Sequence, residues 1–155
     1  LKEQSPRIIR GNASEIMALA GYSSVTKGPE STSSSADALH AARELALHTG
    51  AAVLVTGRTD YSTDGRQVTA TENGHAMMSR VTGVGCSMGA LSAACAAVSP
   101  TPLQAAVSTA VLMGIAGEMA FEQSPFPGSF AVSLLDSLYA LSPEDVVRRA
   151  RFLSL

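Results

Sequence analysis

The sequence is poor in charge and in cysteine, and both shortages disfavour classes of protein. Charged residues make up 15% of the 155 residues, and the net charge is −2. A broad nucleic-acid-binding surface needs a basic stripe, so that class is disfavoured. The two cysteines, Cys86 and Cys95, lie nine residues apart in one expected helix, a span of about 13 Å that exceeds the reach of a disulfide. We therefore expect free thiols in a reducing, cytoplasmic environment.

Long apolar runs and ligand clusters are also lacking. The opening residues, LKEQSPRIIRGN, contain no apolar core of a secretory signal. The most apolar stretch, residues 102–119, is interrupted by three polar side chains, which predicts a buried helix rather than a membrane span. The three histidines are scattered and, with two distant cysteines, give no zinc-ligand spacing. The chain also starts without Met, and we expect it to be part of a longer protein.

Hydrophobic residues make up 46% of the chain, which suits one packed domain over residues 1–155. Apolar runs and helical periodicities alternate along it, which predicts a layered α/β/α fold with a mainly parallel sheet. Strands are expected at 7–10 and 51–57, followed by two more around a turn at Asp64–Gly65. Helices are expected at 11–21, 36–50, 84–97, 102–123, 131–141 and 142–153, with a loop over 22–35 and a turn over 124–130.

The stretch VTGVGC, residues 81–86, is the strongest local signal for a binding site. Two glycines precede an alanine-rich helix, and the free N–H groups at a helix start attract anions. It is neither a P-loop nor a dinucleotide-binding fingerprint. The alternative interpretation is a tight turn into a buried helix. Cys86 is either a thiolate with a lowered pKa or a small packing residue, and Cys95 is expected in the core.

A second group of candidate residues lies at the ends of the two expected parallel strands. Arg10 could reach a phosphate with its guanidinium, and Glu15 could hold Mg²⁺ directly or through water. Alternatively, Arg10 is a solvated charge, and Glu15 only completes a capping box with Asn12. Thr56 ends its strand where ligands gather in α/β sheets, or it is an ordinary junction.

Four stretches resemble the hydroxyethylthiazole kinase family, the thiazole-salvage enzymes of thiamine biosynthesis, which have the ribokinase-like fold. They are IIRGNASEIMALAG, AAVLVTGRTDYSTDG, NGHAMMSRVTGVGCSMGALSAA and PGSF, in the family's order. The resemblance implies ATP-dependent phosphorylation of the primary alcohol of 4-methyl-5-(2-hydroxyethyl)thiazole. It also implies Mg²⁺ and a homotrimer with active sites between subunits.

The resemblance also implies roles for single residues. Arg10 and Thr56 would bind ATP, and Glu15, with Asn12 beside it, would place Mg²⁺ and the phosphates. Gly83 would contact the thiazole. The transferring phosphoryl group would lie in an anion hole made by the amides of Gly83, Val84, Gly85 and Cys86. Cys86 stands where most ribokinase-like relatives carry an aspartate base, so it could accept the proton of the substrate hydroxyl.

The chain departs from the family in two local patterns and in length. Val84 stands where the family usually has threonine, and GPEST, residues 28–32, replaces a more usual GVDS. Such kinases are nearer to ~250 residues, the size at which a single core stops growing. We therefore expect these residues to be the C-terminal part of a kinase domain that lacks its N-terminal segment here.

Two other functions are compatible with the sequence. One is an ATP-dependent dehydratase of hydrated nicotinamide nucleotides, which shares the fold. Its members carry Gly-Asp where this chain has Gly85-Cys86, so the cysteine disfavours it. The other is an inactive nucleotide-binding remnant, or a half that a partner completes. The presence of the candidate phosphate-binding residues favours the kinase.

Overall fold

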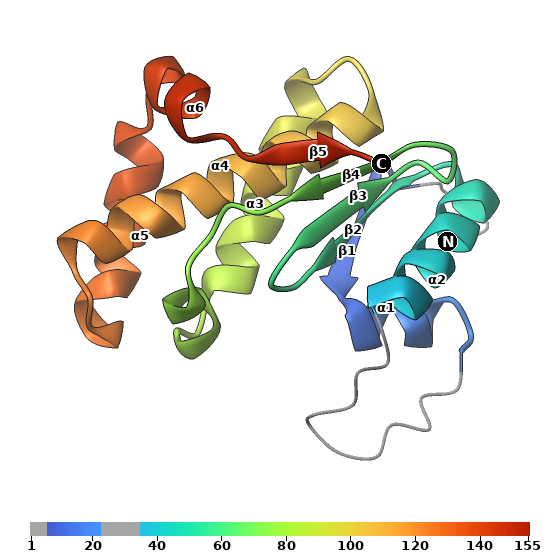
Figure 1. The fold of residues 1–155 in the computed structure, drawn as a ribbon, viewed down its shortest axis with the longest axis horizontal. Helices are drawn as coiled ribbons and strands as arrows, with labels where there is room; N and C mark the ends of the chain where they lie inside the picture. Colours follow the sequence, from blue (N-terminus) through green and yellow to red (C-terminus); the bar gives the residue numbers. More distant parts are fainter. Residues whose placement is uncertain (1–5, 23–34) are drawn as a thin grey trace.

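The computed structural model describes residues 6–22 and 35–155, so most of the predicted loop over 22–35 lies outside the described residues. Within these ranges five strands form one sheet in the order β1-β2-β3-β4-β5 (Figure 1). The strands are β1 (Ile8–Asn12), β2 (Ala52–Thr56), β3 (Asp60–Thr63), β4 (Val68–Thr71) and β5 (Phe152–Ser154).

The α/β class is confirmed, but the sheet is mixed rather than mainly parallel. Of the strand pairs in the described ranges, β1–β2 is parallel and the other three are antiparallel. The connections after β2 and β3 are too short for the crossover that a parallel neighbour requires. The predicted turn at Asp64–Gly65 is confirmed, since the Asp64 carboxylate accepts hydrogen bonds from the N–H groups of Arg66 and Gln67.

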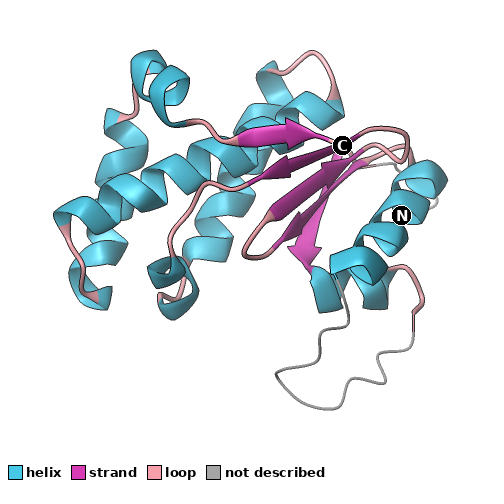
Figure 2. Ribbon diagram, in the orientation of Figure 1, coloured by secondary structure: helices cyan, strands magenta, loops and turns pink. Residues whose placement is uncertain are grey.

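Helices cover both faces of the sheet, which confirms the three layers (Figures 1 and 2). Ile9, Val53 and Val55 pack in one cluster that includes apolar residues of α1 and α2. Ala52 and Leu54 alternate with them and pack in the cluster formed with α3, α4 and α5. The helical segments are α1 (Ala13–Leu19), α2 (Ser35–Thr49), the 3₁₀ helix η1 (Ala76–Arg80), α3 (Val84–Val98), α4 (Pro102–Gln123), α5 (Pro127–Ala140) and α6 (Pro143–Arg149).

The long helix α4 has the bounds that the sequence predicts. It begins at Pro102, after Thr101 caps it by accepting a hydrogen bond from the N–H of Gln104. By length and composition it could cross a membrane, but 61% of its most apolar 18-residue window is buried in this fold. The prediction of a buried helix is therefore confirmed, and α4 is the central helix of one core cluster.

Two predictions near the C-terminus are wrong. The PGSF stretch is the first turn of α5 rather than a turn between helices, because Pro127 fits the start of a helix. The last predicted helix, over 142–153, ends at Arg149, and the chain continues as β5, which pairs antiparallel with β4. Two cysteine predictions are confirmed: both thiols are free, and Cys95 is buried. Cys86, whose environment the sequence left open, is exposed.

Candidate functional site

The parallel pair β1–β2 brings two predicted nucleotide-binding residues to one edge of the sheet. Asn12 lies opposite Thr56 in the strand register, and Arg10 lies two residues earlier on β1. The Thr56 hydroxyl donates to the carbonyl oxygen of Gly11 at 3.3 Å, which ties the two strand ends together. The carboxyl ends of parallel strands are the usual place for ligands in α/β sheets. The juxtaposition of Arg10 and Thr56 is therefore the start of a site.

The start of α3 adds backbone donors. Gly83 precedes the helix with φ +98°, a left-handed conformation that favours glycine, and it has no side chain to cap the helix. The first helical bond runs from the N–H of Ser87 to the carbonyl of Gly83. The N–H groups of Val84, Gly85 and Cys86 therefore precede the first α-helical bond and are available to a ligand. The exposed Cys86 lies in this same first turn.

Arg10 and the start of α3 lie against each other. A Cβ atom built on Gly85 would lie 3.9 Å and 4.0 Å from the two terminal guanidinium nitrogens of Arg10. A side chain at position 85 would therefore contact the guanidinium directly, and glycine leaves that space open. The Arg10 guanidinium thus lies beside the positive end of a 15-residue helix. This combination of guanidinium, amides and dipole is suited to binding a phosphate.

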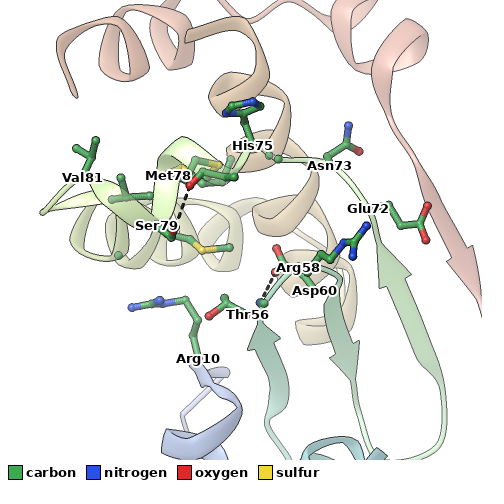
Figure 3. A pocket seen from close by; sticks show the side chains of 18 residues that line it. Arg10, Thr56, Arg58, Asp60, Glu72, Asn73, His75, Met78, Ser79 and Val81 are labelled. Carbon is green, nitrogen blue, oxygen red and sulfur yellow. Dashed lines mark hydrogen bonds between the residues drawn. The ribbon is translucent and has the colours of Figure 1, made fainter. Parts of the chain in front are cut away.

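A cavity of about 840 Å³ opens between the strand ends, the residues that follow β4 and the start of α3. Four of the predicted residues line it, namely Arg10, Thr56, Val84 and Gly85. Figure 3 shows Arg10, Thr56 and Asp60 on the strand side and Asn73, His75 and Met78 on the opposite side. Its size is that of a small-molecule site.

The other four predicted residues do not line the cavity. Gly83 and Cys86 flank it in the turn into α3. Asn12 caps α1 by accepting a hydrogen bond from the N–H of Glu15, and the Glu15 carboxylate accepts one from the N–H of Asn12 at 2.8 Å. The capping box is therefore formed. It leaves the exposed Glu15 carboxylate one further oxygen for a ligand.

Asp60 also lines the cavity, although no sequence pattern predicted a ligand-binding role for it. It begins β3, and its carboxylate accepts a hydrogen bond from the N–H of Gly57 at 2.9 Å, which closes the turn after Thr56. Burial raises the pKa of Asp60 to about 6, while this hydrogen bond acts in the opposite direction. The turn that presents Thr56 and Arg58 to the cavity is therefore closed by one half-buried carboxyl group.

Residues 72–78 form the opposite wall of the cavity, a position that no sequence pattern predicted. It lies close to α4 because two glycines one turn apart, Gly114 and Gly117, leave room for it. The wall is held further by a stack between His75 and Phe121, whose ring centroids are 3.6 Å apart. Paired glycines at i and i+3 on a helix share one face. The spacing of Gly114 and Gly117 is therefore the sequence signal that another segment packs closely against α4.

The comparisons with known proteins point to one family. A model described as the hydroxyethylthiazole kinase family matches residues 1–144. The chain is 99% identical over 155 residues to a hydroxyethylthiazole kinase of Akkermansia muciniphila, covering 100% of this chain and 57% of that protein. It is 53% identical over 141 residues to the one of Granulibacter bethesdensis, covering 91% of this chain and 52% of that protein.

A solved structure leads to the same family. The fold matches the hydroxyethylthiazole kinase protein from Pyrococcus horikoshii OT3 with a TM-score of 0.83 and 36% sequence identity. This match covers 96% of the chain and 54% of that protein, so the chain spans about half the length of the relatives it matches. Because the family model covers nearly the whole sequence and the relatives agree with it, the chain belongs to the hydroxyethylthiazole kinase family.

Proposed function

We propose that this chain is the C-terminal part of a kinase that transfers the γ-phosphoryl group of ATP to the primary alcohol of 4-methyl-5-(2-hydroxyethyl)thiazole, in thiamine salvage. The observation that carries the proposal is the Arg10 guanidinium against Gly85 at the start of α3. It supports a phosphate site in the lining of a cavity large enough for a nucleotide. The family's name supplies the alcohol substrate.

In this reaction the substrate hydroxyl oxygen attacks the γ-phosphorus, and the bond from that phosphorus to the bridging oxygen of ADP breaks. Arg10 binds the phosphates, with Thr56 and Asn12 beside it, and the amides of residues 83–86 hold the oxygens of the transferring group. Gly83 contacts the thiazole. Donors that are already in place stabilise the developing charge without reorganising. Cys86, in the first turn of α3, is assigned the uptake of the proton that the hydroxyl loses.

One carboxylate of this chain, that of Glu15, is suited to binding Mg²⁺. The structure offers no group of three or more metal-ligating side chains within residues 6–22 and 35–155. Mg²⁺ is commonly held by one or two carboxylates together with substrate phosphates and water. The free oxygen of Glu15 is suited to that role, since its other oxygen is used in the capping box. When bound, the ion neutralises phosphate charge.

The phosphate role of Arg10 is tested in a full-length kinase that carries this chain. Initial rates with Mg-ATP and hydroxyethylthiazole should give a KM for ATP that rises about 10- to 100-fold in Arg10→Gln, the loss of a charge-assisted phosphate contact. The matched control is Arg7→Gln, at an exposed arginine that donates to the carbonyl of Ser99. An unchanged KM in Arg10→Gln, or an equal rise in Arg7→Gln, contradicts the assignment.

The role of Cys86 as base has its own test. Cys86→Ser should lower turnover, because a hydroxyl is a weaker acid than a thiol and does not supply the anion. Cys86→Asp should keep or raise turnover, because the carboxylate supplies an anionic base at the same position. Cys95→Ala removes the buried thiol of the same helix and serves as the control. Full turnover in Cys86→Ser would show that the amides suffice without a base.

The whole enzyme is expected to be a cytoplasmic homotrimer whose active sites lie between subunits. Light scattering on the full-length protein tests the trimer. Product formation by the 155-residue chain alone, with its intact mass confirmed, would exclude an inactive remnant. Absence of product from this chain, with activity in the full-length protein, would restrict the kinase function to the longer chain.

A further inference from the structure

The cavity wall at Asn73 and Gly74 is held from behind by the carboxylate of Glu118 on α4. One oxygen of Glu118 accepts hydrogen bonds from the Asn73 side-chain amide at 3.1 Å and from the N–H of Gly74 at 2.9 Å. Both wall residues line the cavity, while Glu118 itself does not. The side chain of Glu118 is only 15% exposed. A carboxylate with this much of its surface buried fixes its partners more firmly than a solvated one.

The C-terminal segment closes this arrangement from the other side. The Arg151 guanidinium pairs with Glu118 and donates to the carbonyl of Glu72 at 3.0 Å. The N–H of Arg151 donates to the side-chain oxygen of Asn73 at 2.7 Å, and the Asn73 amide donates to the carbonyl of Arg149 at 2.9 Å. Asn73 is 6% exposed, and both the oxygen and the amide group of its side chain are hydrogen-bonded. These bonds link three elements that are distant in the sequence.

The family model ends at residue 144, so it does not include the segment that supplies these partners. We propose that Glu118 is a positioning residue for the nucleotide, and that residues 149–154 act with it as a clasp holding Asn73 and Gly74 at the cavity. The proposal rests on the proposed function, because it assumes that the cavity binds ATP. The clasp acts through the wall and touches no reacting atom.

Glu122 provides a matched control one turn further along α4. Its carboxylate also pairs with the C-terminal segment, through two hydrogen bonds from Arg149 at 2.7 and 3.0 Å. No hydrogen bond in the described structure joins Glu122 to the wall residues Asn73 and Gly74. Glu118→Ala and Glu122→Ala therefore both remove an ion pair to the C-terminal segment. Only Glu118→Ala frees the wall.

The experiment compares these two variants in a full-length kinase that carries this chain. We expect Glu118→Ala to raise the KM for ATP about tenfold, the cost of losing a charge-assisted hydrogen bond, with little change in kcat. The KM for the thiazole alcohol should stay the same. A merely structural loss would lower the active fraction and so the apparent kcat, without moving the KM for ATP. Glu122→Ala should leave both KM values unchanged.

A second readout does not depend on activity. Hydrogen exchange at the amide of Gly74 should become about tenfold faster in Glu118→Ala and stay unchanged in Glu122→Ala. Glu118→Gln keeps an acceptor for this amide, so it should fall between the wild type and Glu118→Ala, and it replaces Glu118→Ala if that variant fails to fold. Equal effects at positions 118 and 122, or an unmoved KM for ATP, overturn the clasp. If the wild-type protein does not phosphorylate the thiazole alcohol, the proposed function is overturned, while the hydrogen-exchange result remains valid.

Discussion

Gly114 sets how closely the cavity wall approaches α4, and adding one methyl group there tests this directly. A Cβ atom at position 114 would lie 2.5 Å from the Cβ of Asn73, 2.7 Å from its carbonyl carbon and 2.8 Å from its carbonyl oxygen. Carbon atoms pack at about 3.5–4.0 Å. The wall must therefore move away by about 1 Å in Gly114→Ala. Two of the three close atoms are backbone, so no side-chain rotation relieves the contact.

The expected cost is the balance of two terms. Overpacking a well-packed site lowers the free energy of unfolding by about 1–3 kcal/mol. Replacing a helical glycine by alanine raises it by up to about 1 kcal/mol. The free energy of unfolding should therefore fall by about 1–2 kcal/mol. Because the displaced Asn73 leaves its place beside Glu118, the KM for ATP should rise as well. Urea denaturation and steady-state kinetics of the full-length kinase measure the two effects.

Two other helical glycines provide the comparison. A Cβ at Gly89 on α3 meets no heavy atom within 4 Å, so Gly89→Ala should raise the free energy of unfolding by about 0.5–1 kcal/mol. A Cβ at Gly117 would overlap the sulfur of Met78, a flexible side chain that can turn aside. Gly117→Ala should therefore cost less than Gly114→Ala. If Gly114→Ala is as stable as Gly89→Ala, the close approach of the wall to α4 is refuted.

Three further substitutions test single residues of the site and the sheet. The pKa of Asp60 is raised from 3.8 to about 6, so the native state binds this proton more tightly than the unfolded state, and the protein loses stability as pH rises from about 4 to 6. Asp60→Asn should therefore raise the free energy of unfolding by up to about 3 kcal/mol at pH 7.5 and leave it unchanged below pH 4. Urea denaturation at a series of pH values measures this difference. The Thr71 hydroxyl is buried without a hydrogen-bond partner among the described residues, so Thr71→Val should stabilise the protein by about 1 kcal/mol, and a loss of stability in denaturation would indicate a partner. Gly83 has φ +98°, so Gly83→Ala should cost about 1–2 kcal/mol of stability and lower kcat, whereas unchanged kinetics would contradict the proposed role of Gly83 in an anion hole.

Features that depend on a few neighbouring residues were predictable from the sequence. Asn12 and Glu15 form the predicted capping box, and α4 has its predicted bounds from Pro102 to Gln123. The turn after β3 forms at Asp64, as expected. A cap, a proline at a helix start and a turn residue act within one turn of the chain, so their physics is contained in a short stretch of sequence.

The direction of the strands and the end of the chain were not predictable in the same way. The apolar run of β2 favoured a parallel sheet, yet short connections make its neighbour β3 antiparallel. The residues after Arg149 continue a helical pattern in the sequence but form β5 instead. The free edge of β4 offers them backbone hydrogen bonds, such as that from the N–H of Leu155 to the carbonyl of Val68. Pairing of this kind depends on a distant strand, which local periodicity does not report.

The sequence by itself determined the identity of the chemical groups: an arginine, a threonine, a glycine turn before a helix and a cysteine in its first turn. Only the tertiary structure decided that Arg10 lies against Gly85, that the half-buried Asp60 lines the cavity, and that Glu118 holds Asn73 in place. The reason is physical. A side chain's chemistry is a property of its residue, but its distance to a remote partner and its exclusion from water follow from the order of strands and the packing of helices on them.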